Sequence, residues 1–391
     1  MEPRPFEIQI PQAKVDSILD RVRGFNWPAF KSPENDGNWR HGPPTRFMRH
    51  LCQHWTSEDY DFRERERRMN RHPQFKANID DIDVHFVHVK GDKDDLPPLL
   101  LLHGWPYSFY SLSSLVESLR HRFHLIVPSM PGYHFSTAPK TPMGPKAISH
   151  VFHRLMTQSL GYHRYYVHGG DWGSMLADLL GLYHADSVLG VHFTQYSVRH
   201  YDAAARDGRH PADADANEVS FAKLESDCWS RGQGAYGQIH AWKANKLAYA
   251  LADSPVGAAA WILEAFHAWA DLSQSPSQAA LLKSEGGPFD IDSLIDEVML
   301  YLVTDSLPSS LWIYTGEVVE ASNLLPKGKR VEVPCAILAL PDPVFPMPPK
   351  SVLERSHNVV RYTRSDRGGH FAFYEVPQVL AQDICDAFTT P

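Results

Sequence analysis

The chain has 391 residues, more than the ~150 residues of an average domain, which predicts two or three structural units. Hydrophobic residues make up 43% of the chain and charged residues 21%, proportions typical of packed globular proteins rather than disordered ones. The formal net charge of −8 excludes the basic surface that a nucleic-acid-binding protein needs.

Cysteine usage and hydropathy favour a cytoplasmic globular protein. The four cysteines lie far apart and form no Cys-x-x-Cys pair, which excludes a disulfide scaffold and a cysteine-rich zinc site and fits a reducing compartment. The polar, proline-broken start lacks the pattern of a signal peptide, and no run of ~18 apolar residues predicts a transmembrane helix. The cysteines are Cys52, Cys228, Cys335 and Cys385.

The 22 histidines raise the question of a metal site. A His-Glu-x-x-His motif is absent from the sequence, and His85 and His88 lie three apart in an extended segment, so they point to opposite faces. We therefore expect scattered core or solvated histidines, no metal and no cofactor.

Residues 1–80 predict a structural preface without a catalytic pattern. Segments 13–19 and 46–55 have apolar residues at helical spacing, and segment 62–68 is a helix of alternating charges that is expected to present a solvated face.

From residue 82, predicted strands and helices alternate, a pattern typical of a doubly wound, mostly parallel sheet. The alternation stops between residues 201 and 307, which are mostly helical in pattern. We expect these residues to form a lid over the carboxyl ends of the strands, with core segments 81–200 and 308–391 on either side of it in the chain. The predicted strands are 84–89, 97–102, 124–127, 164–167, 189–193, 336–340 and 359–362, and the predicted helices include 112–119, 149–160 and 258–270.

The most informative motif is Val-His-Gly-Gly-Asp-Trp-Gly-Ser at residues 167–174, between a predicted strand and a predicted helix. Small residues on both sides of one polar residue suit a strained strand–turn–helix elbow that exposes a nucleophile. The exposed residue is Asp171, where esterases carry serine, and a carboxylate nucleophile suits alkyl electrophiles such as epoxides or haloalkanes. The alternative is a glycine-rich turn in which Asp171 only caps a helix.

Two further motifs fit the same catalytic arrangement. His-Gly-Trp-Pro at 103–106 follows an apolar strand, and there the backbone N–H of Trp105, with that of Trp172, is placed to stabilise an oxyanion. Late in the chain, Arg-Gly-Gly-His-Phe at 367–371 supplies His370 as a general base for water. A surface histidine in a glycine turn is the alternative for His370.

Taken together, these motifs make the chain resemble an epoxide hydrolase of the microsomal and juvenile-hormone type. The resemblance covers nearly the whole chain and implies an α/β-hydrolase fold with a helical lid and an amino-terminal epoxide-hydrolase segment. It also rests on residues 5–8, 25–28, 38–39, 60–63, 70, 73–75 and 84–88 of the preface and 249–257 of the lid.

The resemblance further implies two lid tyrosines that hold the epoxide oxygen, and these positions are similar to Tyr236 and Tyr314. A phenol can donate a hydrogen bond to that oxygen, although either residue alone could equally be a packing residue. The implied partners are a small epoxide and water, without nucleic acid or an integral membrane segment, and a homodimer stays open.

One departure from the family concerns the acid that orients the histidine. The family has a Phe-Pro-x-acid context, which reads Phe-Pro-Met-Pro here, so Pro348 occupies the acid's position. Asp342, directly after the preceding predicted strand, is the candidate orienter of His370. The alternative is that a backbone carbonyl or water orients His370.

The sequence thus predicts a cofactor-independent epoxide hydrolase that acts through an Asp171 ester. Two alternatives stay open: a haloalkane dehalogenase-like hydrolase, which would need Trp or Asn donors for the halide, and a catalytically impaired ligand-binding descendant.

Overall fold

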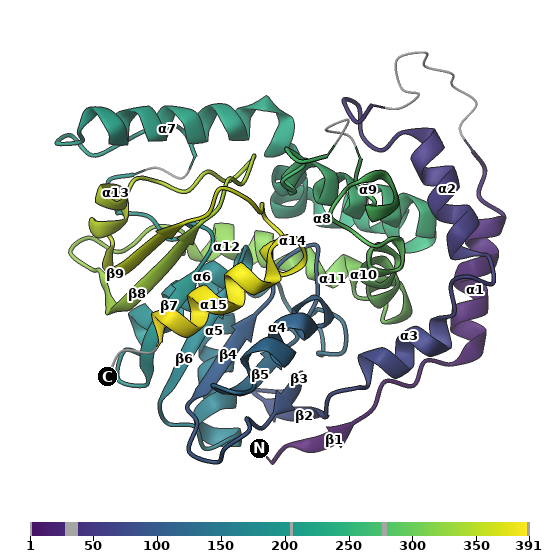
Figure 1. Ribbon diagram of the computed structural model, residues 1–391, viewed down its shortest axis with the longest axis horizontal. Coiled ribbons are helices and arrows are strands. Elements are labelled where there is room, and N and C mark those ends of the chain that lie inside the picture. Colours follow the sequence, from purple (N-terminus) through teal and green to yellow (C-terminus); the bar gives the residue numbers. More distant parts are fainter. Residues whose placement is uncertain (1, 28–37, 204–205, 276–279, 389–391) are drawn as a thin grey trace.

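A computed structural model describes residues 2–27, 38–203, 206–275 and 280–388, so Pro28, which ends the 25–28 motif, lies outside the described residues. In this described part the chain forms a sheet with strand order β1-β2-β3-β5-β4-β6-β7-β8-β9 (Figure 1). The strands are β1 (Arg4–Phe6), β2 (Gln74–Ile79), β3 (Ile82–Val89), β4 (Pro98–Leu102), β5 (His124–Pro128), β6 (Tyr165–Gly169), β7 (Val188–Phe193), β8 (Val331–Ala339) and β9 (His357–Arg364).

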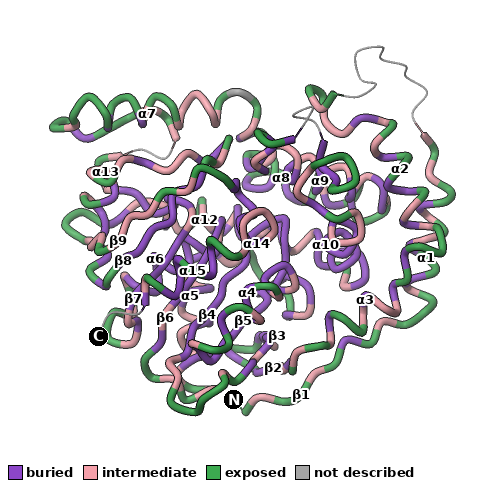
Figure 2. The backbone as a smooth tube through the Cα atoms, viewed as in Figure 1, coloured by how far each residue is buried: buried purple, intermediate pink, exposed green. Residues whose placement is uncertain are grey.

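The sheet is parallel from β5 through β9, which confirms the predicted mostly parallel α/β architecture. The central strands β4 and β5 are buried along their whole length because helices cover both faces (Figure 2). Helix α4 (Ser113–Leu119) packs beside α15 (Pro377–Ala387) on one face, and α5 (Pro145–Arg154) packs beside α6 (Trp172–Tyr183) on the other (Figure 1).

The preface contributes two strands that the sequence analysis missed. Strands β1 and β2 extend the sheet by antiparallel pairing, with Phe75 of β2 opposite Phe86 of β3. A three-residue strand and the mixed segment Gln-Phe-Lys-Ala-Asn-Ile lack the alternation or apolar run that identifies strands in a sequence. The expected preface helices are present as α1 (Gln12–Arg23), α2 (Thr45–Trp55) and α3 (Phe62–Met69).

The preface helices pack against the lid (Figure 1). The expected solvated face of α3 is present, but Arg65 lies on the other face: it is buried and donates from Nε to Asp296 Oδ2 at 2.8 Å. Tyr60 donates its hydroxyl to the same carboxylate at 3.1 Å. The side chains of Glu64 and Arg67 lie on the solvated face of α3, whereas Phe62, Arg65 and Met69 form its buried face.

The helical stretch begins with α7 and continues past residue 307 to Glu320. Its helices are α7 (Ala216–Cys228), α8 (Ala235–Asp253), α9 (Pro255–Trp269), α10 (Ile291–Val303), α11 (Leu307–Ser310) and α12 (Trp312–Glu320). Short helical turns lie at η1 (Tyr110–Leu112), η2 (Leu155–Ser159), η3 (Trp229–Gln233), η4 (Lys283–Glu285), α13 (Lys350–Glu354) and α14 (Ala372–Glu375).

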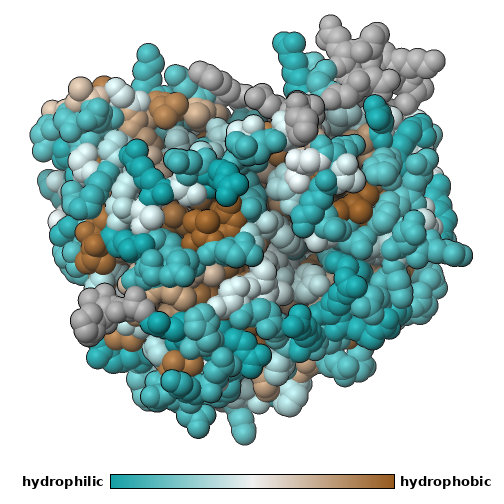
Figure 3. Space-filling view, viewed as in Figure 1, coloured by the Kyte–Doolittle hydropathy of each residue, from teal (hydrophilic) through white to brown (hydrophobic). Residues whose placement is uncertain are grey.

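The face shown in Figure 3 is mostly hydrophilic, with hydrophobic side chains in small patches. Within the residues that the structure describes, every helix is too short or too polar to cross a membrane.

Candidate active site

Asp171 occupies a tight elbow between β6 and α6, with backbone angles φ 51° and ψ −127°. The neighbouring glycines permit this turn, because a Cβ on Gly169 would lie 2.0 Å from the Gly173 carbonyl oxygen. A Cβ on Gly173 would lie 2.3 Å from the carbonyl oxygen of Leu102 on the adjacent strand. Gly169 and Gly173 are therefore required by close backbone approach, as the elbow interpretation predicts.

The carboxylate of Asp171 is held by the loop that follows β4. Its Oδ1 atom accepts a hydrogen bond from the Trp105 backbone N–H at 2.8 Å. A Cβ on Gly104 would lie only 2.3 Å from the same oxygen, so a larger residue there would displace the carboxylate. Asp171 also precedes α6, whose positive end favours a negative charge, and the Trp172 amide is the first of that helix.

His370 lies between two carboxylates. Its Nδ1 is 2.9 Å from Asp342 Oδ2, and its Nε2 is 3.5 Å from Asp171 Oδ2. The other oxygen of Asp342, Oδ1, accepts the backbone N–H groups of Val344 and Phe345, each at 2.8 Å. These two bonds fix the carboxylate at the end of β8 with one oxygen directed at the imidazole.

The two carboxylates determine the protonation of His370. Burial opposes the charged imidazolium, but hydrogen bonding and charge from Asp171 and Asp342 outweigh it and raise the pKa of His370 to about 9. The histidine is therefore positively charged at neutral pH.

Glu375 is a further residue at this site that the sequence analysis did not single out. Its carboxylate accepts the N–H groups of Gly369 and Phe371, on either side of His370, each at 2.9 Å. It also accepts the N–H of Asp271, two residues after α9, at 2.7 Å. Burial outweighs these bonds and raises the pKa of Glu375 to about 7. Glu375 thus fastens the histidine loop to the lid, a link that only tertiary structure reveals.

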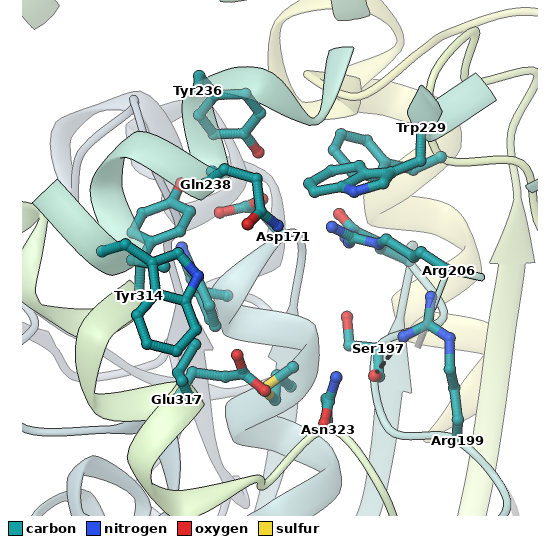
Figure 4. Close-up of a pocket in the computed structure, with 18 residues that line it drawn as sticks. Asp171, Ser197, Arg199, Arg206, Trp229, Tyr236, Gln238, Tyr314, Glu317 and Asn323 are labelled. Carbon is teal, nitrogen blue, oxygen red and sulfur yellow. Dashed lines mark hydrogen bonds between the residues drawn. The ribbon is translucent and has the colours of Figure 1, made fainter. Parts of the chain in front are cut away.

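Tyr236 of α8 and Tyr314 of α12 line a cavity of about 170 Å³ together with Asp171 (Figure 4). Their rings lie 5.9 Å apart, and the ring of Trp172 meets Tyr314 edge-on at 4.7 Å. The Tyr314 hydroxyl is buried without a hydrogen-bond partner in the described part of the chain. Burial raises the pKa of both phenols, so both keep the proton they would donate.

The structure therefore brings all seven predicted site residues into one region. Asp171, His370 and Asp342 form a continuous line of contacts, the Trp105 amide already contacts Asp171, and the two tyrosines and Trp172 lie around the cavity. The same cavity is lined by Gln195, Arg199, Arg206, Trp229 and Glu317, which the sequence analysis did not identify.

Comparison with known proteins gives the family of the chain. Residues 3–112 match the family described as "Epoxide hydrolase N terminus", and residues 97–210 match "alpha/beta hydrolase fold". The chain is 30% identical to juvenile hormone epoxide hydrolase 1 of Ctenocephalides felis, over 98% of this chain and 85% of that protein. It is also 30% identical to epoxide hydrolase 1 of Sus scrofa, over 97% of this chain and 87% of that protein.

The chain belongs to the epoxide hydrolase family. Its fold is similar to the crystal structure of juvenile hormone epoxide hydrolase from Bombyx mori, with a TM-score of 0.84 and 26% identity over 99% of this chain and 94% of that one. It is also similar to the epoxide hydrolase of Aspergillus niger, with a TM-score of 0.80 and 27% identity over 99% and 96% of the two chains. The activity of this epoxide hydrolase is the opening of an epoxide by water.

Proposed function

We propose that the reaction proceeds through an ester on Asp171. Tyr236 and Tyr314 hydrogen-bond the epoxide oxygen while Asp171 Oδ2 attacks a ring carbon. The ring carbon–oxygen bond breaks as the carbon–Oδ2 bond forms, and a tyrosine gives its proton to the leaving oxygen. The products of this half-reaction are an alkyl ester of Asp171 and a neighbouring hydroxyl group. The observation that carries this proposal is the shared cavity of Asp171 and both phenols (Figure 4).

In the second half-reaction, His370 removes a proton from a water molecule, which attacks the Asp171 carbonyl carbon. Oδ1 then becomes the oxyanion, and it already accepts the Trp105 N–H at 2.8 Å. The Trp172 amide is the second donor at this position. Collapse of the tetrahedral intermediate breaks the bond between Oδ2 and the Asp171 carbonyl carbon, and the imidazolium of His370 gives its proton to Oδ2. A vicinal diol leaves, and Asp171 is again a carboxylate.

The charge of Asp171 also sets the order of the two half-reactions. In the free enzyme that charge helps to keep His370 protonated. Ester formation removes the charge, so the pKa of His370 falls. Its proton then returns to the tyrosine that protonated the leaving oxygen, and the neutral imidazole can act as a base once the intermediate has formed. Asp342 remains charged and keeps the ring oriented through Nδ1.

A single turnover in ¹⁸O-water tests this mechanism. With enzyme in excess, the heavy oxygen should enter Asp171, because water attacks the carbonyl carbon of the ester and the diol takes Oδ2. Mass spectrometry of the peptide that contains Asp171 and of the diol measures both positions. Label in the first-turnover diol would show direct attack by water and contradict the ester. In a parallel assay with a haloalkane, halide release would favour the dehalogenase alternative if the epoxide gave no diol.

The sequence-based expectations of a cytoplasmic location and of a homodimer belong to this proposal as well. The first is supported by the cysteines, which form no disulfide in the described part of the chain and of which Cys52, Cys335 and Cys385 are buried.

A further inference from the structure

Arg206 places a positive charge in the active-site cavity without a matching carboxylate. Its guanidinium carbon lies 3.9 Å from the centre of the Trp229 ring and 5.1 Å from that of Phe345. Figure 4 shows the side chain beneath Trp229, extending toward Asp171. Within the described part of the chain, the Arg206 side chain makes no hydrogen bond or ion pair. The ring contacts hold the guanidinium in place and leave its N–H donors facing the cavity.

Arg199 lines the same cavity but, unlike Arg206, has partners within the protein. It is ion-paired with Glu225, and it donates to the Ser197 carbonyl oxygen at 2.9 Å. The charge of Arg199 is therefore compensated within the protein, although its Nε atom is buried without a partner in the described residues. The charge of Arg206 is not compensated in this way.

Glu317 is the acid across the cavity, and it forms no ion pair with Arg206 in the described residues. Burial raises the pKa of its carboxyl group, which favours the neutral form. Gln195 adds a further unsatisfied group, because its Oε1 atom is buried without a hydrogen-bond partner among the described residues. The cavity thus has an aromatic region near Asp171 and a polar region in which Arg206, Arg199 Nε and Gln195 Oε1 lack hydrogen-bond partners in the described residues.

We infer that the substrate is an epoxide that carries a carboxylate, and that Arg206 binds this carboxylate while the ring lies at Asp171. The inference rests on the proposed function, and it adds a substrate class to it. A guanidinium can bind a carboxylate through two parallel hydrogen bonds, which would satisfy the free donors of Arg206. The cavity of about 170 Å³ is smaller than those that hold drug-sized ligands, so the chain between ring and carboxylate is short.

The test compares a terminal epoxyhexanoate with its neutral amide, epoxyhexanamide. The wild-type enzyme should prefer the acid, with a difference of about 10- to 100-fold in kcat/KM, as expected for a charge-assisted hydrogen bond. Arg206→Met should remove this preference through a higher KM for the acid, with little change for the amide. Arg206→Lys keeps the charge but loses the paired geometry, so it should restore part of the preference.

Arg209→Met is the matched control. Arg209 lies three residues further along, is exposed, and pairs with Asp207 at 2.7 Å outside the active-site cavity. Its substitution removes one positive charge from the same segment and should leave both substrates unaffected.

Three results would overturn the inference. Equal wild-type kcat/KM for acid and amide would exclude a carboxylate site, whatever the stability of the variants. An equal loss of kcat for both substrates in Arg206→Met would show that Arg206 acts on the charge of Asp171 instead. Loss of the acid preference in Arg209→Met would show a general effect of net charge. Absence of any diol from either substrate would contradict the proposed function itself. Turnover of both substrates without a preference for the acid would contradict only the inference that Arg206 binds a substrate carboxylate.

Discussion

Asp342 Oδ2 lies 2.9 Å from His370 Nδ1, although the position where the family context places its acid is occupied by Pro348. The Asp342 carboxylate is fixed by the Val344 and Phe345 amides, so it is a rigid partner for the ring. A carboxylate at the end of β8 can thus reach the same nitrogen from a different place in the loop.

Asp342→Asn should therefore slow hydrolysis of the ester far more than its formation. Asparagine can still accept the two backbone N–H groups, but it no longer stabilises the imidazolium or fixes the correct tautomer. We expect about 10²- to 10⁴-fold slower hydrolysis. Rapid-quench measurement of adduct formation and decay separates the two steps. Asp366→Asn, at an exposed position in the loop before His370, is the control. An unchanged rate of adduct decay in Asp342→Asn would show that Asp342 does not orient His370.

His370→Gln should leave Asp171 able to attack the epoxide but remove the base for water. The ester should accumulate, and intact-protein mass spectrometry should show an added mass equal to that of the substrate. A general base contributes roughly 10²- to 10⁴-fold, enough to make ester hydrolysis the slow step. Asp171→Ala is the control, because it has no carboxylate to modify. Native multiple turnover by His370→Gln would exclude the proposed base.

The charges around His370 should also make stability depend on pH. Its pKa is raised from 6.5 to about 9 in the folded protein, so the stabilisation is fully present below pH 6.5 and is lost as the pH rises through about 9. Such a shift corresponds to roughly 3 kcal/mol for a buried group. Asp171→Asn removes one of the two carboxylates and should reduce this loss, as measured by urea unfolding between pH 6 and 10. An identical pH dependence in both proteins would show that Asp171 does not hold the proton on His370.

The fold and the main motifs were accessible from the sequence because their signals are local. The apolar run of β4 indicates a buried strand, and the glycines around Asp171 indicate close approach of the backbone. Glu375 and Arg206 carry no such signal, because their chemistry arises from partners in other elements. Glu375 links the histidine loop to the lid through the N–H of Asp271. The guanidinium of Arg206 is held in the cavity by its contact with the ring of Trp229.

The burial of Arg65 also could not be predicted from the sequence. Its context of alternating charges indicates a solvated helix, but its side chain is buried against Asp296. Burial raises the pKa of Asp296 to about 6, yet Arg65 and the Tyr60 hydroxyl bind the carboxylate. Removal of one partner from such a buried pair leaves an uncompensated charge, which costs about 3–5 kcal/mol.

Arg65→Met should therefore lower the free energy of unfolding by several kcal/mol and loosen the contact between the preface and the lid. Arg67→Met is the matched control on the same helix: its pair with Glu64 is exposed, and its loss should change stability by at most about 0.5 kcal/mol. The double variant Arg65→Met/Asp296→Leu removes both charges and should recover most of the loss, apart from the hydrogen bond of Tyr60. Urea unfolding of the four proteins measures these differences. Equal stability of the two single variants would mean that the Arg65–Asp296 pair does not join the preface to the lid energetically.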